Sequence, residues 1–347
     1  MGFWSSTTAS PTFWDVLGLG GGHTPRFLRT TQAPAPPLPS GLRIQRADVG
    51  NTGAVASFWR AYYRGADWSY DLTPGVMESV CAGYLKDVGV ICLCLYDAHG
   101  ELIATIMSTP IGKAMFGHGG VVENMRSVEG LCVHDRYRSK GIAGLMIGWI
   151  DHVTSASGNV VNLWSRELDV LPWYNTAAAL HTYVYINSRA AMATVPFERV
   201  AWDAFATRWM ANAARWATEH DRAIVATTPQ NRRGDLHVFR SLDRIAVISN
   251  TRRVTRDGAA IYELVWCGTG DLKPCYDPSR FQQFLESVCA GGLCVGDRIL
   301  FVGCGDGGGE WGTPWVTGKS GYHAWYIYNY IPPAFGSCVL NIMREEL

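Results

Sequence analysis

A short basic turn lies where a predicted strand leads into a predicted helix in the middle of the sequence. The segment 128–153 begins as an apolar strand, passes through Arg138-Ser139-Lys140-Gly141 and ends as an amphipathic stretch. A helix N-terminus presents unpaired backbone N–H groups and a partial positive charge. Two cations, a hydroxyl donor and a glycine that permits close backbone approach add to that charge. The turn therefore predicts a binding site for a pyrophosphate.

Regular elements on both sides of the turn must hold it in place. We expect a helix over 53–64, hairpin strands at 88–97 and 101–110, a loop over 111–126 and strands at 127–133 and 159–165. Downstream of the turn, a helix is predicted from about residue 141, because apolar residues recur along one stripe: Ile142, Leu145, Met146, Trp149, Ile150 and Val153.

The second half of the chain contains the same mixture of strands and helices. We expect strands within 242–249, 259–266, 297–303 and 324–330, and helices over 201–219 and 279–289. The buried side of the helix over 201–219 should consist of Trp202, Phe205, Trp209, Met210 and Trp216. Both halves show a β–β–α–β-like order, so we predict an α+β (α/β) chain with two halves.

Composition narrows the classes of partner. The chain has 347 residues, more than one core usually serves, and its 30 basic residues balance its 30 acidic ones. A neutral chain lacks the basic face that nucleic acid requires. Ten cysteines without a CxxC pair predict a reduced protein without a zinc site. We expect no membrane span and no signal peptide, and a cytoplasmic monomer.

Longer motifs around the turn resemble a known family. Arg138 to Ala143 reads R-x-x-G-x-A, which resembles the coenzyme A loop of the GNAT acyltransferase superfamily. Leu131-Cys132-Val133-His134 followed by Arg138-Ser139-Lys140 resembles the N-myristoyltransferase family of that superfamily. Three further blocks resemble this family in the same order: 13–15 (FWD), 38–42 (LPSGL) and 325–333 (WYIYNYIPP).

The resemblance implies a fold and an activity. The fold would be two GNAT-like halves around a saddle-shaped mixed sheet. An irregular arm (1–40) would close over the acyl-CoA, an acyl-CoA-binding half would span 41–200, and a peptide-binding half would span 201–347. The reaction would move a myristoyl group from myristoyl-CoA to the N-terminal glycine amine of a protein or peptide, without a metal.

The resemblance also implies roles for individual residues. The backbone amides of Gly130 and Leu131 would polarise the thioester, and the carboxylate of Leu347 would act as the base. Acyl-CoA would contact Thr12, Phe13, Trp14, Gly130, Leu131, Cys132, Val133, Arg138, Ser139, Lys140, Gly141, Ile142 and Ala143. The peptide would contact Tyr63, Asp67, Trp68, Tyr70, His181, Tyr183, Asn187 and Tyr328. For His134, a structural or CoA-adjacent role is expected instead of a role as base.

The sequence departs from the family pattern at functional positions. Gly130 stands where the family has phenylalanine, the family's acidic cluster is reduced at 63–67, and the chain runs about two residues past the usual end. Glu345 or Glu346 could then replace Leu347 as base, or the base could be lost. Two alternatives follow: an acyl-CoA or acyl-peptide binding protein without catalysis, and a GNAT N-acyltransferase that uses a different acyl-CoA and amine.

Overall fold

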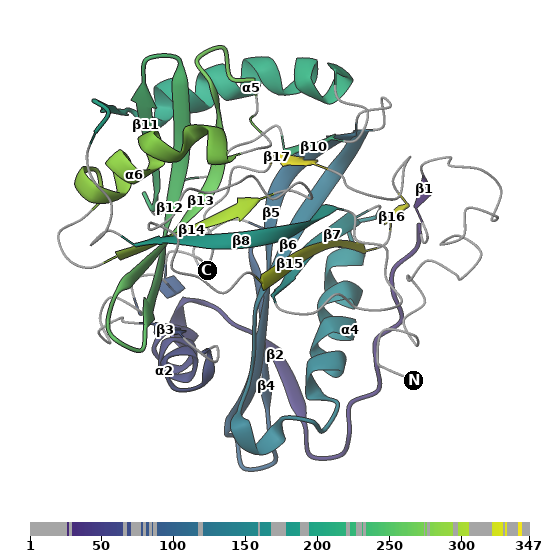
Figure 1. Ribbon diagram of the computed structural model, residues 1–347. Helices are drawn as coiled ribbons and strands as arrows, with labels where there is room; N and C mark the ends of the chain where they lie inside the picture. The colour runs from purple at the N-terminus through teal and green to yellow at the C-terminus, as the bar shows by residue number, and fades with distance from the viewer. Residues whose placement is uncertain are drawn as a thin grey trace. The chain divides into compact units, whose positions relative to one another are not determined.

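The chain is described by a computed structural model, whose helices and strands are labelled in Figure 1. The chain divides into two compact units. Unit 1 comprises 1–112, 122–164 and 327–331, and unit 2 comprises 113–121, 165–326 and 332–347. The predicted division at residues 40 and 200 stays a prediction. The structure describes residues 26–27, 30–64, 68–70, 78, 81–82, 85, 89–116, 121–158, 160–167, 178–187, 194–219, 223–226, 231, 234–273, 275, 278–293, 298–304, 321–328, 330–331 and 339–341.

Unit 1 is built on a mixed sheet. Its strands are β2 (Arg43–Arg46), β4 (Ile91–Tyr96), β5 (Leu102–Phe116), β6 (Val121–Val133) and β7 (Val160–Glu167). β4 pairs antiparallel with β2 and with β5, β5 neighbours β6, and β6 pairs parallel with β7. A parallel pair needs a crossover connection, and here a helix makes it.

Helix α4 (Ile142–Ser155) forms the crossover between β6 and β7 and closes the core of unit 1. Ile142, Met146 and Ile150 are buried, and they join a cluster with strand residues of β4 and β5. Leu145, Trp149 and Val153 pack partly buried against the same cluster, so the predicted stripe is confirmed.

Other elements of unit 1 are shorter. A 3-10 turn, η2 (Val49–Asn51), with a capping box at Asp48 leads into α2 (Thr52–Tyr62). The short strands β1 (Arg26–Phe27) and β16 (Tyr330–Ile331) pair antiparallel. A third short strand, β3, spans Trp68–Tyr70.

The described part of the predicted arm runs along α4. Residues 30–40 form neither helix nor strand. The Ala33 N–H donates to Ser155 Oγ at 2.8 Å, and His152 Nδ1 lies 2.6 Å from the Ala33 carbonyl oxygen. Ala33 is buried. This segment is therefore attached to the C-terminal half of α4.

Unit 2 has a sheet covered on two faces. Its strands include β8 (Ala178–Asn187), β9 (Glu198–Val200), β11 (Leu236–Ser241), β12 (Arg244–Thr255), β13 (Ala260–Thr269), β14 (Arg298–Cys304) and most of β15 (Gly321–Tyr328), in the order β15-β8-β14-β13-β12-β11-β9. β13 and β14 are parallel, and the other described pairs of this sheet are antiparallel. Two further strands, β10 (Ala223–Ala226) and β17 (Val339–Asn341), pair parallel.

The two helices of unit 2 bury alternate residues of β11 and β12. Leu236 and Val238 face a cluster with α5 (Trp202–Glu219), whereas Phe239 and Ile248 face a cluster with α6 (Gln282–Gly291). A short 3-10 turn, η4 (Pro278–Phe281), precedes α6. Because side chains alternate along a strand, a sheet covered on both faces reads as continuously apolar.

Two sequence predictions are corrected here. The loop expected over 111–126 is wrong, because β5 continues to Phe116 and β6 begins at Val121. On α5, Phe205 and Trp209 are buried as predicted, but Met210 is 49% exposed. The side chain of Trp216 lies outside the described residues.

Three further findings bear on the expected chemistry. No helix in the described part of the chain is long and apolar enough to cross a membrane. The seven cysteines whose side chains the structure describes are free thiols. Within the residues that the structure describes, no cluster of three or more His, Cys, Asp or Glu side chains is arranged to hold a metal ion.

Candidate functional site

The turn before α4 presents an open helix N-terminus. After β6, a 3-10 turn, η3 (Asp135–Tyr137), leads to Ser139 and Gly141, whose φ angles are 62° and 79°. Gly141 is the N-cap of α4, no side chain caps the helix there, and its first turn contains no acidic residue. Unpaired N–H groups without a nearby carboxylate leave the helix dipole uncompensated. The site is therefore arranged for an anion.

The two cations of the turn have different surroundings. Arg138 donates to the carbonyl oxygens of Val133 and Tyr62, at 3.1 and 3.0 Å, and pairs with Asp135. Its guanidinium thus ties the turn to the end of α2. Lys140 Nζ lies 5.2 Å from the ring centroid of Tyr137, and among the described residues no carboxylate forms an ion pair with it. Lys140 is therefore the cation with more freedom to meet a phosphate.

A buried histidine fixes the end of β6. The backbone N–H of Arg136 donates to His134 Nδ1, so the neutral ring carries its proton on Nε2. Nε2 lies 2.9 Å from Tyr62 Oη and 3.5 Å from Glu101 Oε1. His134 is buried, and both of its ring nitrogens have partners. These contacts give His134 a structural role.

The strand that precedes the turn pairs with its parallel neighbour in its first half. The described pairs of β6 with β7 run from Asn124 to Ser127, although β6 continues to Val133. Gly130 lies beyond the last of these pairs and has a left-handed φ of 63°. Such a φ interrupts regular strand geometry. The peptide group between Gly130 and Leu131 therefore lies at a bend of β6, which leads into the Arg138–Gly141 turn.

Cys132 follows this bend and is not a reactive thiol. It is buried, and burial raises its pKa to about 12. A thiol must lose its proton to act as a nucleophile. Cys132 therefore contributes packing and its backbone.

The structure brings the central part of the predicted site together. Gly130 to Ala143 form one continuous strand–turn–helix segment, and Tyr63 is the C-cap of α2, whose last residue, Tyr62, contacts this segment. Trp68 and Tyr70 lie on β3, and Tyr328 ends β15, where only the backbone is described. Thr12, Phe13, Trp14, Asp67 and Leu347 lie outside the described residues.

Three predicted peptide contacts lie in unit 2. His181, Tyr183 and Asn187 all belong to β8 and share its odd-numbered face. His181 pairs with His323 of β15 in the backbone register, and Asn187 pairs with Ile299 of β14. Their side chains lie outside the described part of the structure, so their role stays a prediction.

Several residues of the site carry no signal in the sequence. Tyr62 contacts His134, and Tyr137 Oη donates to Asp97 Oδ2 at 2.8 Å. A backbone hydrogen bond from Glu101 and the Tyr137 hydroxyl lower the pKa of Asp97. These contacts join residues far apart in the chain, and only the fold reveals them.

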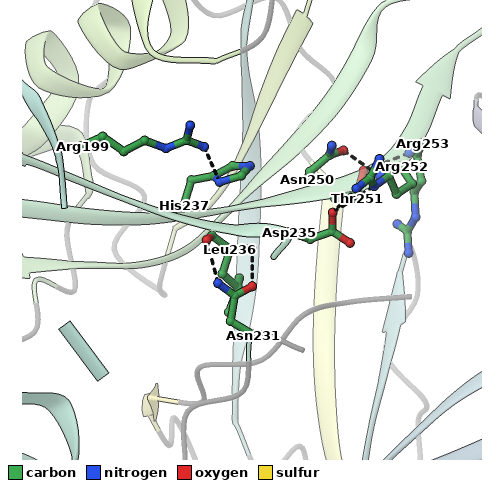
Figure 2. Close-up of polar contacts among 9 residues, drawn as sticks. All are labelled: Arg199, Asn231, Asp235, Leu236, His237, Asn250, Thr251, Arg252 and Arg253. Carbon is green, nitrogen blue, oxygen red and sulfur yellow. Dashed lines mark hydrogen bonds and ion pairs between the residues drawn. The ribbon is translucent and has the colours of Figure 1, made fainter. Parts of the chain in front are cut away.

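Unit 2 contains a separate polar cluster (Figure 2). The buried Asp235 accepts two hydrogen bonds from Arg252, which lies in a bulge of β12 and has a φ of 57°. Arg199 donates to His237 Nδ1 in the same cluster. Burial, followed by the charge of Arg199, lowers the pKa of His237 to about 4. The cluster supports the bulge of β12.

Comparisons with known proteins now bear on the fold. No protein-family model matches the sequence, and no curated protein matches it. A crystal structure of Saccharomyces cerevisiae N-myristoyltransferase with bound myristoyl-CoA matches with a TM-score of 0.67 and 12% identity, over 94% of this chain and 92% of that chain. A second structure of that enzyme with myristoyl-CoA matches with a TM-score of 0.65 and 13% identity, over 98% and 89% of the two chains.

At identities this low, the structural match establishes the fold alone. The match extends over nearly the whole of both chains. It confirms the predicted fold class, an α+β chain with a mixed sheet. This chain has the fold of an N-myristoyltransferase.

Proposed function

We propose that this protein transfers a myristoyl group from myristoyl-CoA to the N-terminal glycine amine of proteins, as a cytoplasmic monomer. The observation that carries the proposal is the open N-terminus of α4 behind the Arg138–Gly141 turn. The strand that leads into this turn bends at Gly130, and the whole chain has this fold. An acyl-CoA needs both an anion site for its phosphates and a donor for its thioester oxygen.

The proposed roles follow from the chemistry of each group. The N–H groups of α4, with Ser139 and Lys140, would bind the pyrophosphate, while Arg138 would hold the turn in shape. The amides of Gly130 and Leu131 would stabilise the oxyanion that forms when the amine attacks the thioester carbonyl. The attacking amine must also lose a proton to a base, and the carboxylate of Leu347 stays our prediction for that base.

The test is thiol release from myristoyl-CoA with a panel of peptides, alongside native mass spectrometry of the protein with acyl-CoAs of different chain length. Release should require a free N-terminal glycine, so an acetylated glycine peptide and an alanine-first peptide are the matched controls. Release with another amine or a shorter acyl group would favour a different GNAT N-acyltransferase. Bound myristoyl-CoA without turnover would favour a binding protein.

A charge reversal tests the anion site separately. Lys140→Glu should weaken binding of myristoyl-CoA about tenfold, because it places a negative charge beside the pyrophosphate. Lys273→Glu reverses another exposed lysine, in unit 2, and should leave the affinity unchanged. Equal affinities for both variants would contradict the proposed site.

A further inference from the structure

A buried chain of two hydrogen bonds ends on the peptide group of the proposed oxyanion site. Trp59 Nε1 donates to Thr105 Oγ1 at 2.8 Å, and Thr105 Oγ1 donates to the Gly130 carbonyl oxygen at 3.1 Å. The three residues come from α2, β5 and β6, all within unit 1. Trp59 is 1% exposed and Thr105 is 0% exposed.

The direction of both hydrogen bonds is fixed by the chemistry of the groups. An indole N–H can only donate, so the Thr105 hydroxyl accepts from Trp59. The single hydroxyl hydrogen is then available for the Gly130 carbonyl, which can only accept. Because both side chains are buried, bulk water cannot readily replace either partner.

The two hydrogen bonds, which together form a relay from Trp59 through Thr105 to Gly130, also act on the N–H of Leu131. The Gly130 carbonyl and the Leu131 N–H belong to one planar peptide group, and in a trans peptide they point in opposite directions. Holding the carbonyl therefore also orients the N–H, away from Thr105. A hydrogen bond to the carbonyl oxygen also polarises the amide and makes its N–H a stronger donor.

Gly130 needs such an external restraint. It has no Cβ, and its φ of 63° lies in a region that glycine enters and leaves at low cost. A peptide group attached to this residue would rotate easily if nothing held it. A donor that must point at a developing negative charge is effective only when it is oriented in advance.

We infer that Trp59 and Thr105 are positioning residues that orient and polarise the Gly130–Leu131 peptide group, so that the Leu131 N–H points at the thioester oxygen. The inference rests on the proposed function, because it assigns these residues to the oxyanion site of that reaction. Neither side chain contacts the substrate; both act through the Gly130 carbonyl.

Substitutions at Thr105 test this relay of hydrogen bonds. Thr105→Val keeps the shape and removes the hydroxyl, so kcat should fall about tenfold while the Kd for myristoyl-CoA changes less than about twofold. Thr105→Ser keeps the hydroxyl and should restore kcat to within about twofold. Thr109→Val is the matched control, since Thr109 is a buried threonine of β5 whose hydroxyl donates to Glu129 instead.

A second readout does not depend on activity. Loss of the hydrogen bond at the Gly130 carbonyl should shift the amide proton resonance of Leu131 upfield in Thr105→Val, but not in Thr105→Ser or Thr109→Val. In protein labelled with 15N only at leucine, the resonance is assigned by its loss in Leu131→Met. An inactive wild-type protein would overturn the proposed function. A Leu131 resonance that Thr105→Val leaves in place would overturn the relay.

Trp59 is tested through its dependence on Thr105. Trp59→Phe should reduce kcat, and the same change in the Thr105→Val background should have no further effect, because the relay is already broken there. Independent losses in the two backgrounds would contradict the relay. Circular dichroism of each variant checks that the fold persists.

Discussion

At the scale of single residues, the side chains of Cys132 and His134 have structural roles. Cys132 is buried with its pKa raised to about 12, and His134 uses both ring nitrogens in contacts with its own unit. The side chains that sequence reasoning would first examine as nucleophile or base are thus committed to structure. The proposed reaction therefore relies on the main-chain amides of Gly130 and Leu131, which suit oxyanion stabilisation.

His237 in unit 2 makes the stability of the protein dependent on pH. Its pKa is lowered to about 4 by burial and by Arg199, whereas an unfolded histidine has a pKa near its ordinary value of 6.5. The unfolded state therefore binds the proton more readily between these values. The free energy of unfolding should be constant above about pH 6.5 and fall as the pH decreases toward 4.

His237→Asn should remove part of this acid sensitivity. Asparagine does not titrate, and its Oδ1 can accept the hydrogen bond that Arg199 gives to Nδ1. Because His237 is partly exposed, we expect an effect of about 1–2 kcal/mol between pH 7 and pH 4.5. Urea unfolding at both pH values measures it. The exposed His99 provides a control as His99→Asn, and equal pH dependence in all three proteins would refute the assignment.

At the scale of elements, the N-terminus of α4 depends on a glycine with a left-handed backbone. Gly141 has a φ of 79°, and a Cβ built there would meet nothing within 4 Å. Gly141→Ala should therefore lower the free energy of unfolding by about 1 kcal/mol through backbone strain alone. The added methyl group should also keep a pyrophosphate away from the backbone and weaken myristoyl-CoA binding about tenfold.

Gly158, just past the other end of α4, separates these two effects. It has a φ of 98° and similarly open surroundings. Gly158→Ala should carry a similar stability cost and leave myristoyl-CoA affinity unchanged. Thermal unfolding and calorimetric titration of both variants measure the pair. Equal loss of affinity would mean that the effect is general strain and not a property of the turn.

The middle of α4 lies in close contact with residues 30–40 of the N-terminal arm. A Cβ at Gly148 would lie 2.7 Å from Pro36 Cγ. Alanine is usually about 0.5–1 kcal/mol better than glycine inside a helix, but here it should displace the segment that Ala33 anchors. Gly148→Ala should thus make residues 30–40 several-fold more sensitive to proteinase K. Adding Pro36→Gly, which removes the contact, should restore resistance if this reasoning holds.

Local sequence patterns predict the elements in which apolar residues recur at one regular spacing. They do not predict contacts between segments that are far apart in the chain. The stripe of α4 and the position of its N-terminus follow from the spacing of apolar residues. The region 111–126 was misread as a loop, because the charged residues Lys113 and Glu123 and a nearby glycine cluster resemble a connection. The partners of Gly130 and His134 come from distant segments, and no local pattern encodes them.

At the scale of the whole molecule, zero net charge coexists with a locally cationic turn. The 30 basic and 30 acidic residues cancel, so long-range attraction of a phosphorylated ligand should be weak, and the local groups at α4 should decide its binding. Under the proposed function, this site would select a small anionic group without affinity for nucleic acid.

The same balance predicts how the protein behaves in solution. Its pI is about 7.1, and proteins associate most readily where their net charge is near zero. Solubility should therefore be lowest near pH 7 and rise on both sides. His237 adds no positive charge until about pH 4, because burial and the charge of Arg199 lower its pKa to about 4. Polyethylene glycol precipitation between pH 5 and pH 9 measures the curve. A minimum far from pH 7 would show that local patches, and not the net charge, govern self-association.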